Sequence, residues 1–141
     1  MDRRIYRILI VIAIVCGVAL KVQADVIVVV NKSNEASLDE EKIKNIFLGK
    51  AKYFPDGKAA IPLQMHPGSA DYSSFASKVL GKDDNQLRAY WTRLLFTGRA
   101  TPPKEVDSES QVIDLVAHNP NLIGYVSASS PGLEQVRVVQ P

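Results

Sequence analysis

A glycine–serine pair between a predicted strand and a predicted helix is the clearest candidate for chemistry in this sequence. Residues 61–75 read IPLQMHPGSADYSSF, which indicates a strand over Ile61–Met65, a turn, and a helix that opens at Ser69. The first turn of a helix has unpaired N–H donors and the positive end of the helix dipole, so it attracts anions. The alternative is that Ser69 is only the N-cap of its helix. We expect an oxyanion to bind at Gly68, Ser69, Ala70 and Asp71.

Lys32 and Ser33 form a second part of the predicted oxyanion site. They follow the β-branched run Val26–Val30, which is typical of a buried strand. In open α/β sheets, ligands bind beyond the carboxyl ends of the strands. The alternative is that these two residues form an ordinary connection. His66, beside the glycine–serine turn, has a side chain that titrates near neutral pH, but a lone histidine in a turn is more often an exposed polar residue.

Four cations elsewhere in the chain are candidates to strengthen this site. Lys50 and Lys52 follow the first predicted helix, and Arg99 and Lys104 lie in the predicted loop Gly98–Glu105. They would neutralise an anion if the loop folds toward the glycine–serine turn. The alternative is that they form a solvated surface.

The sequence shows no catalytic constellation. Residues 25–141 contain two histidines, His66 and His118, and no cysteine. The HExxH, GxSxG and phosphate-loop signatures are absent. We therefore expect neither an enzyme nor a bound metal or cofactor. Tyr90 and Trp91 lie at helical spacing with leucines, which favours a place in the core over a stacking platform.

Alternating strands and helices must position these candidates. Ser37 with Glu40 forms a predicted capping box for a helix that ends near Leu48, and Asp83 with Gln86 forms a second one. Ser108 caps a further helix over residues 109–118. The remaining predicted strands are Leu122–Val126 and Gln135–Val139. This order predicts an α/β fold, with a central mixed sheet that has helices on both faces.

The N-terminal segment reads as a signal peptide. Three arginines in the first seven residues precede an apolar run over 8–20, and Val22 and Ala24 fit a small-residue cleavage site. Because the run is shorter than the roughly 20 residues that span a bilayer, we expect cleavage after Ala24 and export to the periplasm. The alternative is an uncleaved anchor. Residues 25–141 are then one domain.

Composition excludes nucleic-acid binding driven by net charge. Four of the 17 Lys and Arg residues and one of the 15 Asp and Glu residues lie in the first 24 positions, which leaves 13 basic and 14 acidic residues. The only cysteine, Cys16, also lies there, so the exported chain needs no disulfide.

Several segments together resemble a known family. They are VVVNKSN at 28–34, IFLGK at 46–50, PDG at 55–57, the Gly68–Ser69 turn, WTRLLFTGRATPP at 91–103 and IGYV at 123–126. Their order resembles the second lobe of the phosphate-type periplasmic substrate-binding proteins of ABC transporters, especially short single-lobe members. The resemblance implies a single periplasmic-binding-protein-like lobe, phosphate as ligand, and an inner-membrane transporter as partner.

The glycine–serine turn departs from the pattern of that family. Family members carry an arginine and a threonine where this chain has Met65 and Asp71, and a second glycine where it has Ala70. The first change removes a cation and the second adds a negative charge, and each costs on the order of 1–3 kcal/mol of anion binding. We therefore expect weak binding of phosphate or a similar oxyanion.

Two hypotheses for function follow. The first is a non-enzymatic, exported solute-binding-protein-like module that binds an oxyanion weakly and is linked to phosphate uptake. The second is a protein-interaction or envelope-assembly module that keeps the fold without the ligand site and docks to a porin or another envelope protein. A homodimer is compatible with both, because a second copy would supply the missing lobe.

Overall fold

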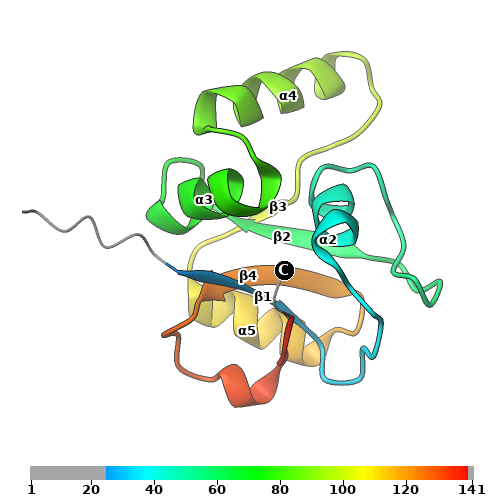
Figure 1. Cartoon of the computed structure of the whole chain (residues 1–141), viewed down its shortest axis with the longest axis vertical. Coiled ribbons are helices and arrows are strands. Elements are labelled where there is room, and N and C mark those ends of the chain that lie inside the picture. Colours follow the sequence, from blue (N-terminus) through cyan, green and yellow to red (C-terminus); the bar gives the residue numbers. More distant parts are fainter. Residues whose placement is uncertain (1–24, 140–141) are drawn as a thin grey trace, which may run out of the picture.

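The protein forms a five-stranded mixed sheet in the strand order β3-β2-β4-β1-β5 (Figure 1). The computed structural model describes residues 25–139, and the predicted signal peptide 1–24 lies outside this range. Strands β2 and β3 run parallel to β4, whereas β1 is antiparallel to both β4 and β5. The strands span Val26–Val30 (β1), Ile61–Met65 (β2), Lys104–Val106 (β3), Leu122–Ser127 (β4) and Arg137–Val139 (β5).

Helices cover both faces of this sheet, as the sequence predicted. Helix α5 (Glu109–His118) packs on one face against β4 and β1. Helices α2 (Glu40–Phe47) and α3 (Ala70–Phe75) lie on the other face, and α4 (Asp84–Phe96) stands outside α3, farther from the sheet (Figure 1). A 3₁₀ turn, η2 (Leu133–Gln135), leads into β5. The fold is therefore a single α/β lobe.

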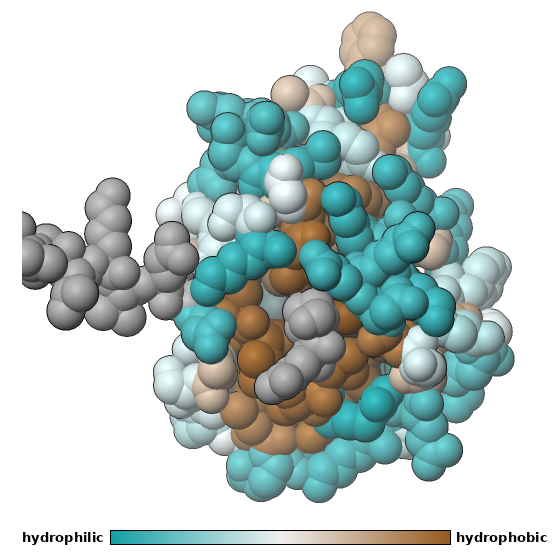
Figure 2. All heavy atoms as spheres, viewed as in Figure 1, coloured by the Kyte–Doolittle hydropathy of each residue, from teal (hydrophilic) through white to brown (hydrophobic). Residues whose placement is uncertain are grey.

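An aromatic cluster fills the core between α2, α3 and β4. Phe75 stacks on Tyr125 with ring centroids 4.0 Å apart, and Phe47 meets Phe75 edge-on at 4.6 Å. Val28, Val29 and Val30 of β1 have no exposed surface, as expected for a strand covered on both faces. In Figure 2 hydrophobic residues gather over the sheet, and hydrophilic residues cover much of the upper part, where α3 and α4 lie.

The helix starts confirm two predicted caps and correct one. Asp83 and Gln86 form the predicted capping box of α4, and the Ser108 side chain caps α5. The N-cap of α2 is Asp39, whose carboxylate accepts the Lys42 amide at 2.8 Å, so the cap predicted at Ser37 is wrong. Leu38 is nearly buried in the core, which holds the preceding residues outside the helix.

The helix predicted from Ser69 to Leu80 has two parts. Helix α3 gives way to a π-helical turn, η1 (Ala76–Leu80), which ends at Gly81 with a left-handed φ of 66°. The widened turn places Ala76, Val79 and Leu80 in the core. Each π turn contains one more residue than an α turn, so η1 changes the direction in which the chain enters α4.

Two expectations about the second half of the chain are wrong in part. The loop predicted over Gly98–Glu105 contains the first two residues of β3, which takes its conformation from pairing with β2. The apolar stripe of α4 is only partly in the core: Leu87 and Trp91 are buried, but Leu95 is 51% exposed. Phe96, the last residue of α4, is 93% exposed.

Over residues 25–139, no helix has the length and apolar character needed to cross a bilayer.

Candidate functional site

The glycine–serine turn lies at the carboxyl end of β2, where the sequence placed it. Gly68 adopts a φ of 87°, which only glycine takes readily, and turns the chain into α3. Ser69 is the N-cap of α3, because its hydroxyl oxygen accepts the Tyr72 amide at 3.3 Å. The capping role that was the alternative is therefore present. The amides of Ala70 and Asp71 belong to the first turn of α3, where an α-helix leaves its donors unpaired.

The Asp71 side chain faces a second carboxyl group, that of Glu109 at the start of α5. Burial and the hydrogen bond with Glu109 raise the pKa of Asp71 to about 6. Burial by itself would also raise the pKa of Glu109, but hydrogen bonds with Asp71, the Ser130 hydroxyl and the Ser127 amide lower it. The Ser127 amide donates to Glu109 Oε1 at 2.8 Å, and the Ser130 hydroxyl donates to Oε2. Below about pH 6 the pair therefore holds one proton, on Asp71, and above that pH the two carboxylates repel each other.

His66 holds two further carboxylates at the same edge. Its Nδ1 lies 3.0 Å from Glu105 Oε2, and its Nε2 lies 2.9 Å from Asp107 Oδ1. These hydrogen bonds, Asp107 first and Glu105 second, raise the pKa of His66. We use the name "acidic edge" for Asp71, Glu105, Asp107 and Glu109. An oxyanion at Ser69 would therefore approach a surface of negative charge, which opposes its binding.

Met65 places no side-chain atom at this edge. It is 8% exposed and packs in the core, while its amide donates to the Tyr125 hydroxyl at 3.0 Å. Burial raises the pKa of Tyr125, so its hydroxyl stays protonated at neutral pH. Met65 thus fixes the end of β2 without supplying a charge.

A cavity of about 640 Å³ opens beside Gly68, between the start of α3 and α4. It contains one cation, Arg88, which donates to Asn85 Oδ1 at 3.1 Å. Asp84 and Glu105 also line it, so it offers no net positive charge to an anion.

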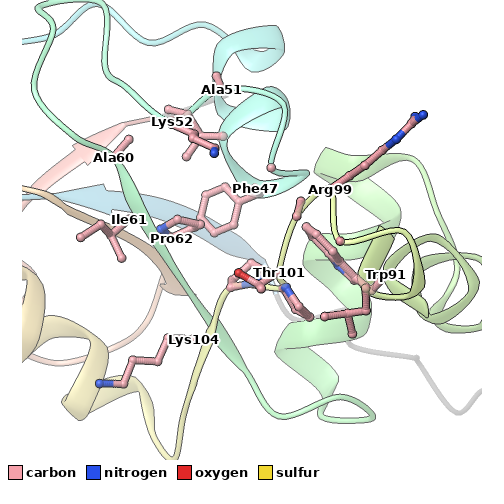
Figure 3. Close-up of a pocket in the computed structure, with 17 residues that line it drawn as sticks. Phe47, Ala51, Lys52, Ala60, Ile61, Pro62, Trp91, Arg99, Thr101 and Lys104 are labelled. Carbon is pink, nitrogen blue, oxygen red and sulfur yellow. The ribbon is translucent and has the colours of Figure 1, made fainter. Parts of the chain in front are cut away.

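Three of the four candidate cations line a groove in a different part of the molecule. Lys52, Arg99 and Lys104 line a groove of about 570 Å³ beside Ile61 and Pro62, the first residues of β2 (Figure 3). The glycine–serine turn follows the last residue of β2, and Ile61 lies about 13 Å from that end of the strand, at about 3.3 Å per residue. Lys104 lies closer to it, because it pairs with Leu63 in the middle of β2. Lys50 follows Gly49 of the groove wall without lining the groove.

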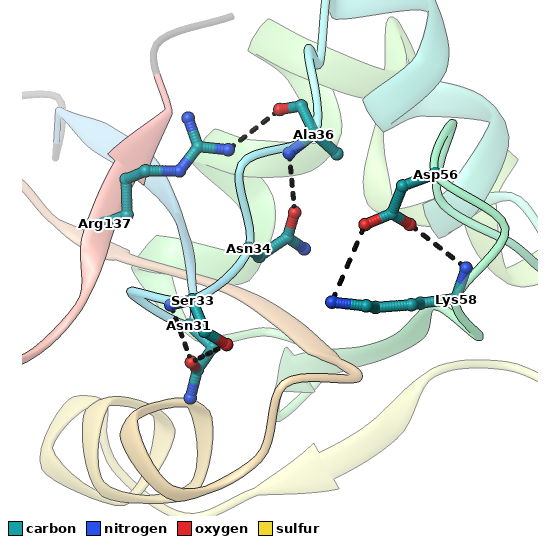
Figure 4. Close-up of polar contacts among 7 residues, drawn as sticks. All are labelled: Asn31, Ser33, Asn34, Ala36, Asp56, Lys58 and Arg137. Atoms are coloured by element: carbon teal, nitrogen blue, oxygen red, sulfur yellow. Dashed lines mark hydrogen bonds and ion pairs between the residues drawn. The ribbon is translucent and has the colours of Figure 1, made fainter.

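Lys32 and Ser33 also lie away from Ser69. Strand β1 is antiparallel to β4, which is parallel to β2, so the carboxyl end of β1 lies at the opposite edge of the sheet from the carboxyl end of β2. The Ser33 amide and hydroxyl both donate to Asn31 Oδ1, at 2.9 and 2.7 Å (Figure 4). Asn31 in turn donates to the Val116 carbonyl of α5 at 2.8 Å. This turn is the ordinary connection that was the alternative.

The residues that define the acidic edge were missed as a group from the sequence. Glu109 is 38 positions from Asp71 in the numbering, and nothing local links the two. One signal was present, because Ser108 predicted a helix start at Glu109. The parallel pairing of β2 with β3, which brings the helices that follow these strands to one edge, was not predicted. Across residues 25–139, no group of three or more His, Cys, Asp or Glu side chains is arranged to hold a metal ion.

Comparison with solved structures identifies the fold. The chain is similar to an ABC-type phosphate transport receptor from Vibrio cholerae, with a TM-score of 0.64 and 21% identity over 82% of this chain. It is also similar to a putative phosphate ABC transporter substrate-binding protein with bound phosphate from Clostridium perfringens, with a TM-score of 0.62 and 21% identity. For PstS from Borrelia burgdorferi the values are 0.60 and 17%.

These matches extend over part of each neighbour. The second and third also cover 82% of this chain, and the three matches cover 45%, 44% and 46% of the respective structures. The chain thus spans less than half the length of the receptors that it resembles. No protein-family model matches this sequence, and no curated protein matches it. At this level of identity the comparison shows the fold, which is that of one lobe of a periplasmic binding protein.

Proposed function

We propose that this protein is an exported, non-enzymatic module of the cell envelope that uses a periplasmic-binding-protein lobe to bind a protein partner. The observation that carries this proposal is the Asp71–Glu109 carboxyl pair at the predicted anion position. A phosphate at Ser69 would need a cation nearby, and the position that carries it in the related family is the buried Met65. Export rests on the signal-peptide pattern of residues 1–24.

Weak oxyanion binding, linked to phosphate uptake, is a second candidate function. It is favoured by the Gly68–Ser69 turn, which presents the first amides of α3, and by the fold shared with phosphate receptors. Its donors would be the amides of Ala70 and Asp71 with the Ser69 hydroxyl. Protonation of Asp71 below about pH 6 would lessen the repulsion, so such binding strengthens at acidic pH. In this function a transporter, porin or second copy of the chain would complete the half-site.

Amide NMR titration with phosphate and sulfate separates the two candidates. Sulfate keeps its charge near neutral pH, so it isolates the titration of the protein from that of the ligand. The first function predicts that millimolar anion leaves the Ser69–Tyr72 amide shifts unmoved both above and below about pH 6. Saturable shifts with micromolar affinity would reject it. Weak shifts only below about pH 6, abolished by Ser69→Ala but not by Ser74→Ala, would establish the second candidate.

A further inference from the structure

The groove beside the start of β2 is the region of this protein best built to receive a partner. Its walls come from the turn after α2, the first residues of β2, and the segment 98–104, and α4 contributes Trp91 and Leu95 (Figure 3). We call this feature the basic groove. Its volume of about 570 Å³ is within the range of ligand sites in proteins.

The charge of the basic groove is of one sign. Lys52, Arg99 and Lys104 line it, and no aspartate or glutamate does. All three are exposed, and none of them forms an ion pair within residues 25–139. A groove lined by cations and by no acidic side chain attracts carboxylates, in contrast to the acidic edge.

The groove also offers apolar surface in a fixed shape. Trp91 lies against Gly49, where an added Cβ would come within 3.4 Å of the indole ring. Pro102 and Pro103 stiffen the segment 98–104, which also lines the groove. Ile61 and Leu95 remain 46% and 51% exposed, so the groove presents apolar surface to solvent.

The arrangement of the cations indicates what the groove would hold. Figure 3 shows Lys52, Arg99 and Lys104 on different sides of the hollow, with their charged ends well separated. One compact anion cannot contact all three. An extended chain with several carboxylates and apolar side chains between them would match both the charges and the exposed Ile61 and Leu95.

We propose that the basic groove binds an acidic polypeptide segment of a partner protein, with carboxylates at Lys52, Arg99 and Lys104 and apolar side chains over Trp91 and Leu95. This inference rests on the proposed interaction function. It does not involve Ser69, Asp71 or the rest of the acidic edge.

Trp91 is the only tryptophan of the chain and lines both the basic groove and the adjoining cavity beside Gly68, so its fluorescence reports binding at either, and the substitutions below assign it to the groove. The probe is a blocked peptide of repeated Asp-Leu-Ser units, and the matched control is the same peptide with Lys in place of Asp. The full chain should bind the acidic peptide with a saturable change in Trp91 emission that weakens as salt is added. The basic peptide should cause no such change.

Substitutions at exposed positions locate the site. Arg99→Glu combined with Lys104→Glu should weaken acidic-peptide binding by about tenfold or more. Leu95→Ser should weaken it with little change in salt dependence, which tests the apolar contact separately. Lys42→Glu, on α2 outside the groove, is the matched charge control and should bind as the unmodified protein does. Circular dichroism checks that each variant is folded.

Any of four results would overturn the inference. One is equal affinity for the acidic and basic peptides. Another is unchanged binding in the Arg99→Glu, Lys104→Glu double variant. The third is self-association in sedimentation experiments that this double variant abolishes, because the occupant would then be a second copy. If no peptide binds and phosphate also leaves the Ser69–Tyr72 amides unmoved, the groove inference fails while the interaction function stands. Micromolar phosphate binding would reject that function directly.

Discussion

The acidic edge and the basic groove lie toward opposite ends of the same strand, β2, adjoin at Glu105 and Lys104 of β3, and carry opposite charge. The acidic edge gathers Asp71, Glu109 and the two carboxylates that hold His66, all against a helix start that would otherwise attract anions. The basic groove gathers three cations from segments with no helix start among them. The difference shows that backbone geometry and side-chain charge can favour anion binding at different ends of one strand. We expect the side chains to decide which end binds an anion, because full charges outweigh the partial charges of a helix end.

Trp91→Ala should give the largest effect, and it tests whether the groove depends on a rigid wall. Trp91 is 6% exposed and lines both the basic groove and the cavity beside Gly68. Its removal should lower the free energy of unfolding by about 3–5 kcal/mol, measured by urea denaturation. Leu94→Ala, a partly buried neighbour, is the control and should cost clearly less. A loss below about 1 kcal/mol for Trp91→Ala would mean that the groove has no fixed wall.

Gly124→Ala should disturb the acidic edge more than the basic groove. A Cβ at Gly124 would lie 2.6 Å from Val112 Cγ1, so the Val112 side chain or α5 itself must shift away from β4. We expect a loss of about 1–3 kcal/mol of stability from this overpacking. Because Glu109 is on α5, NMR shifts should change at Glu109 and Asp71 more than at Arg99 and Lys104. Equal changes at both ends of β2 would contradict the separation of the two regions.

Asp71→Asn should stabilise the protein above about pH 6. The folded-state pKa of Asp71 is raised to about 6 from 3.8. The stability that Asp71 contributes to the folded state is therefore present at low pH and is lost as pH rises through about 6. The amide removes the repulsion and can donate to Glu109, which should add about 1 kcal/mol above pH 6, allowing for partial exposure to solvent. Thermal unfolding at several pH values measures this. Glu35→Gln, an exposed control, should show no such pH-dependent gain. A gain confined to acidic pH would refute the raised pKa of Asp71.

His66→Gln should give the smallest change in stability. Its effect should appear mainly at acidic pH, whereas that of Asp71→Asn appears above about pH 6. Hydrogen bonds with Asp107 and Glu105 raise the pKa of His66, so the stability they contribute is present below its unfolded pKa of about 6.5 and is lost as pH rises through the raised value. The variant should therefore be less stable than the parent mainly at acidic pH. NMR titration of the two histidines provides a direct check, because His66 should titrate above its ordinary value. A normal pKa for His66 would show that the two carboxylates do not hold it in solution.

Much of the fold follows from local patterns. The β-branched run of β1 and the Asp83–Gln86 capping box are present as predicted, because each is specified by adjacent residues. Strand β3 was missed because three residues without a pattern become a strand only through pairing with β2. The cap predicted at Ser37 failed because Leu38 is drawn into the core and a second good cap, Asp39, follows it.

Less of the candidate site than of the fold could be predicted from the sequence. The turn at Gly68 and the cap at Ser69 were predicted, because both are local. The partners of Asp71 and His66 come from the segment 105–109, which reaches this edge only through the parallel pairing of β3 with β2. Lys32 lies at the opposite end of the sheet from Ser69 because β1 runs antiparallel to β4, and no residue pattern revealed that direction.

The π turn η1 has a consequence for how the chain tolerates changes in length. A π turn holds one residue more than an α turn, so deleting one residue from Ala76–Leu80 can restore a regular α-helix. The same deletion would rotate everything that follows by about 100° around the helix axis, at 3.6 residues per turn. Since α4 follows η1 and carries Trp91, such a deletion would keep a helix in place and still misdirect the wall of the groove. A deletion scan of this segment should therefore separate helix content from binding, with circular dichroism largely preserved where the groove is lost.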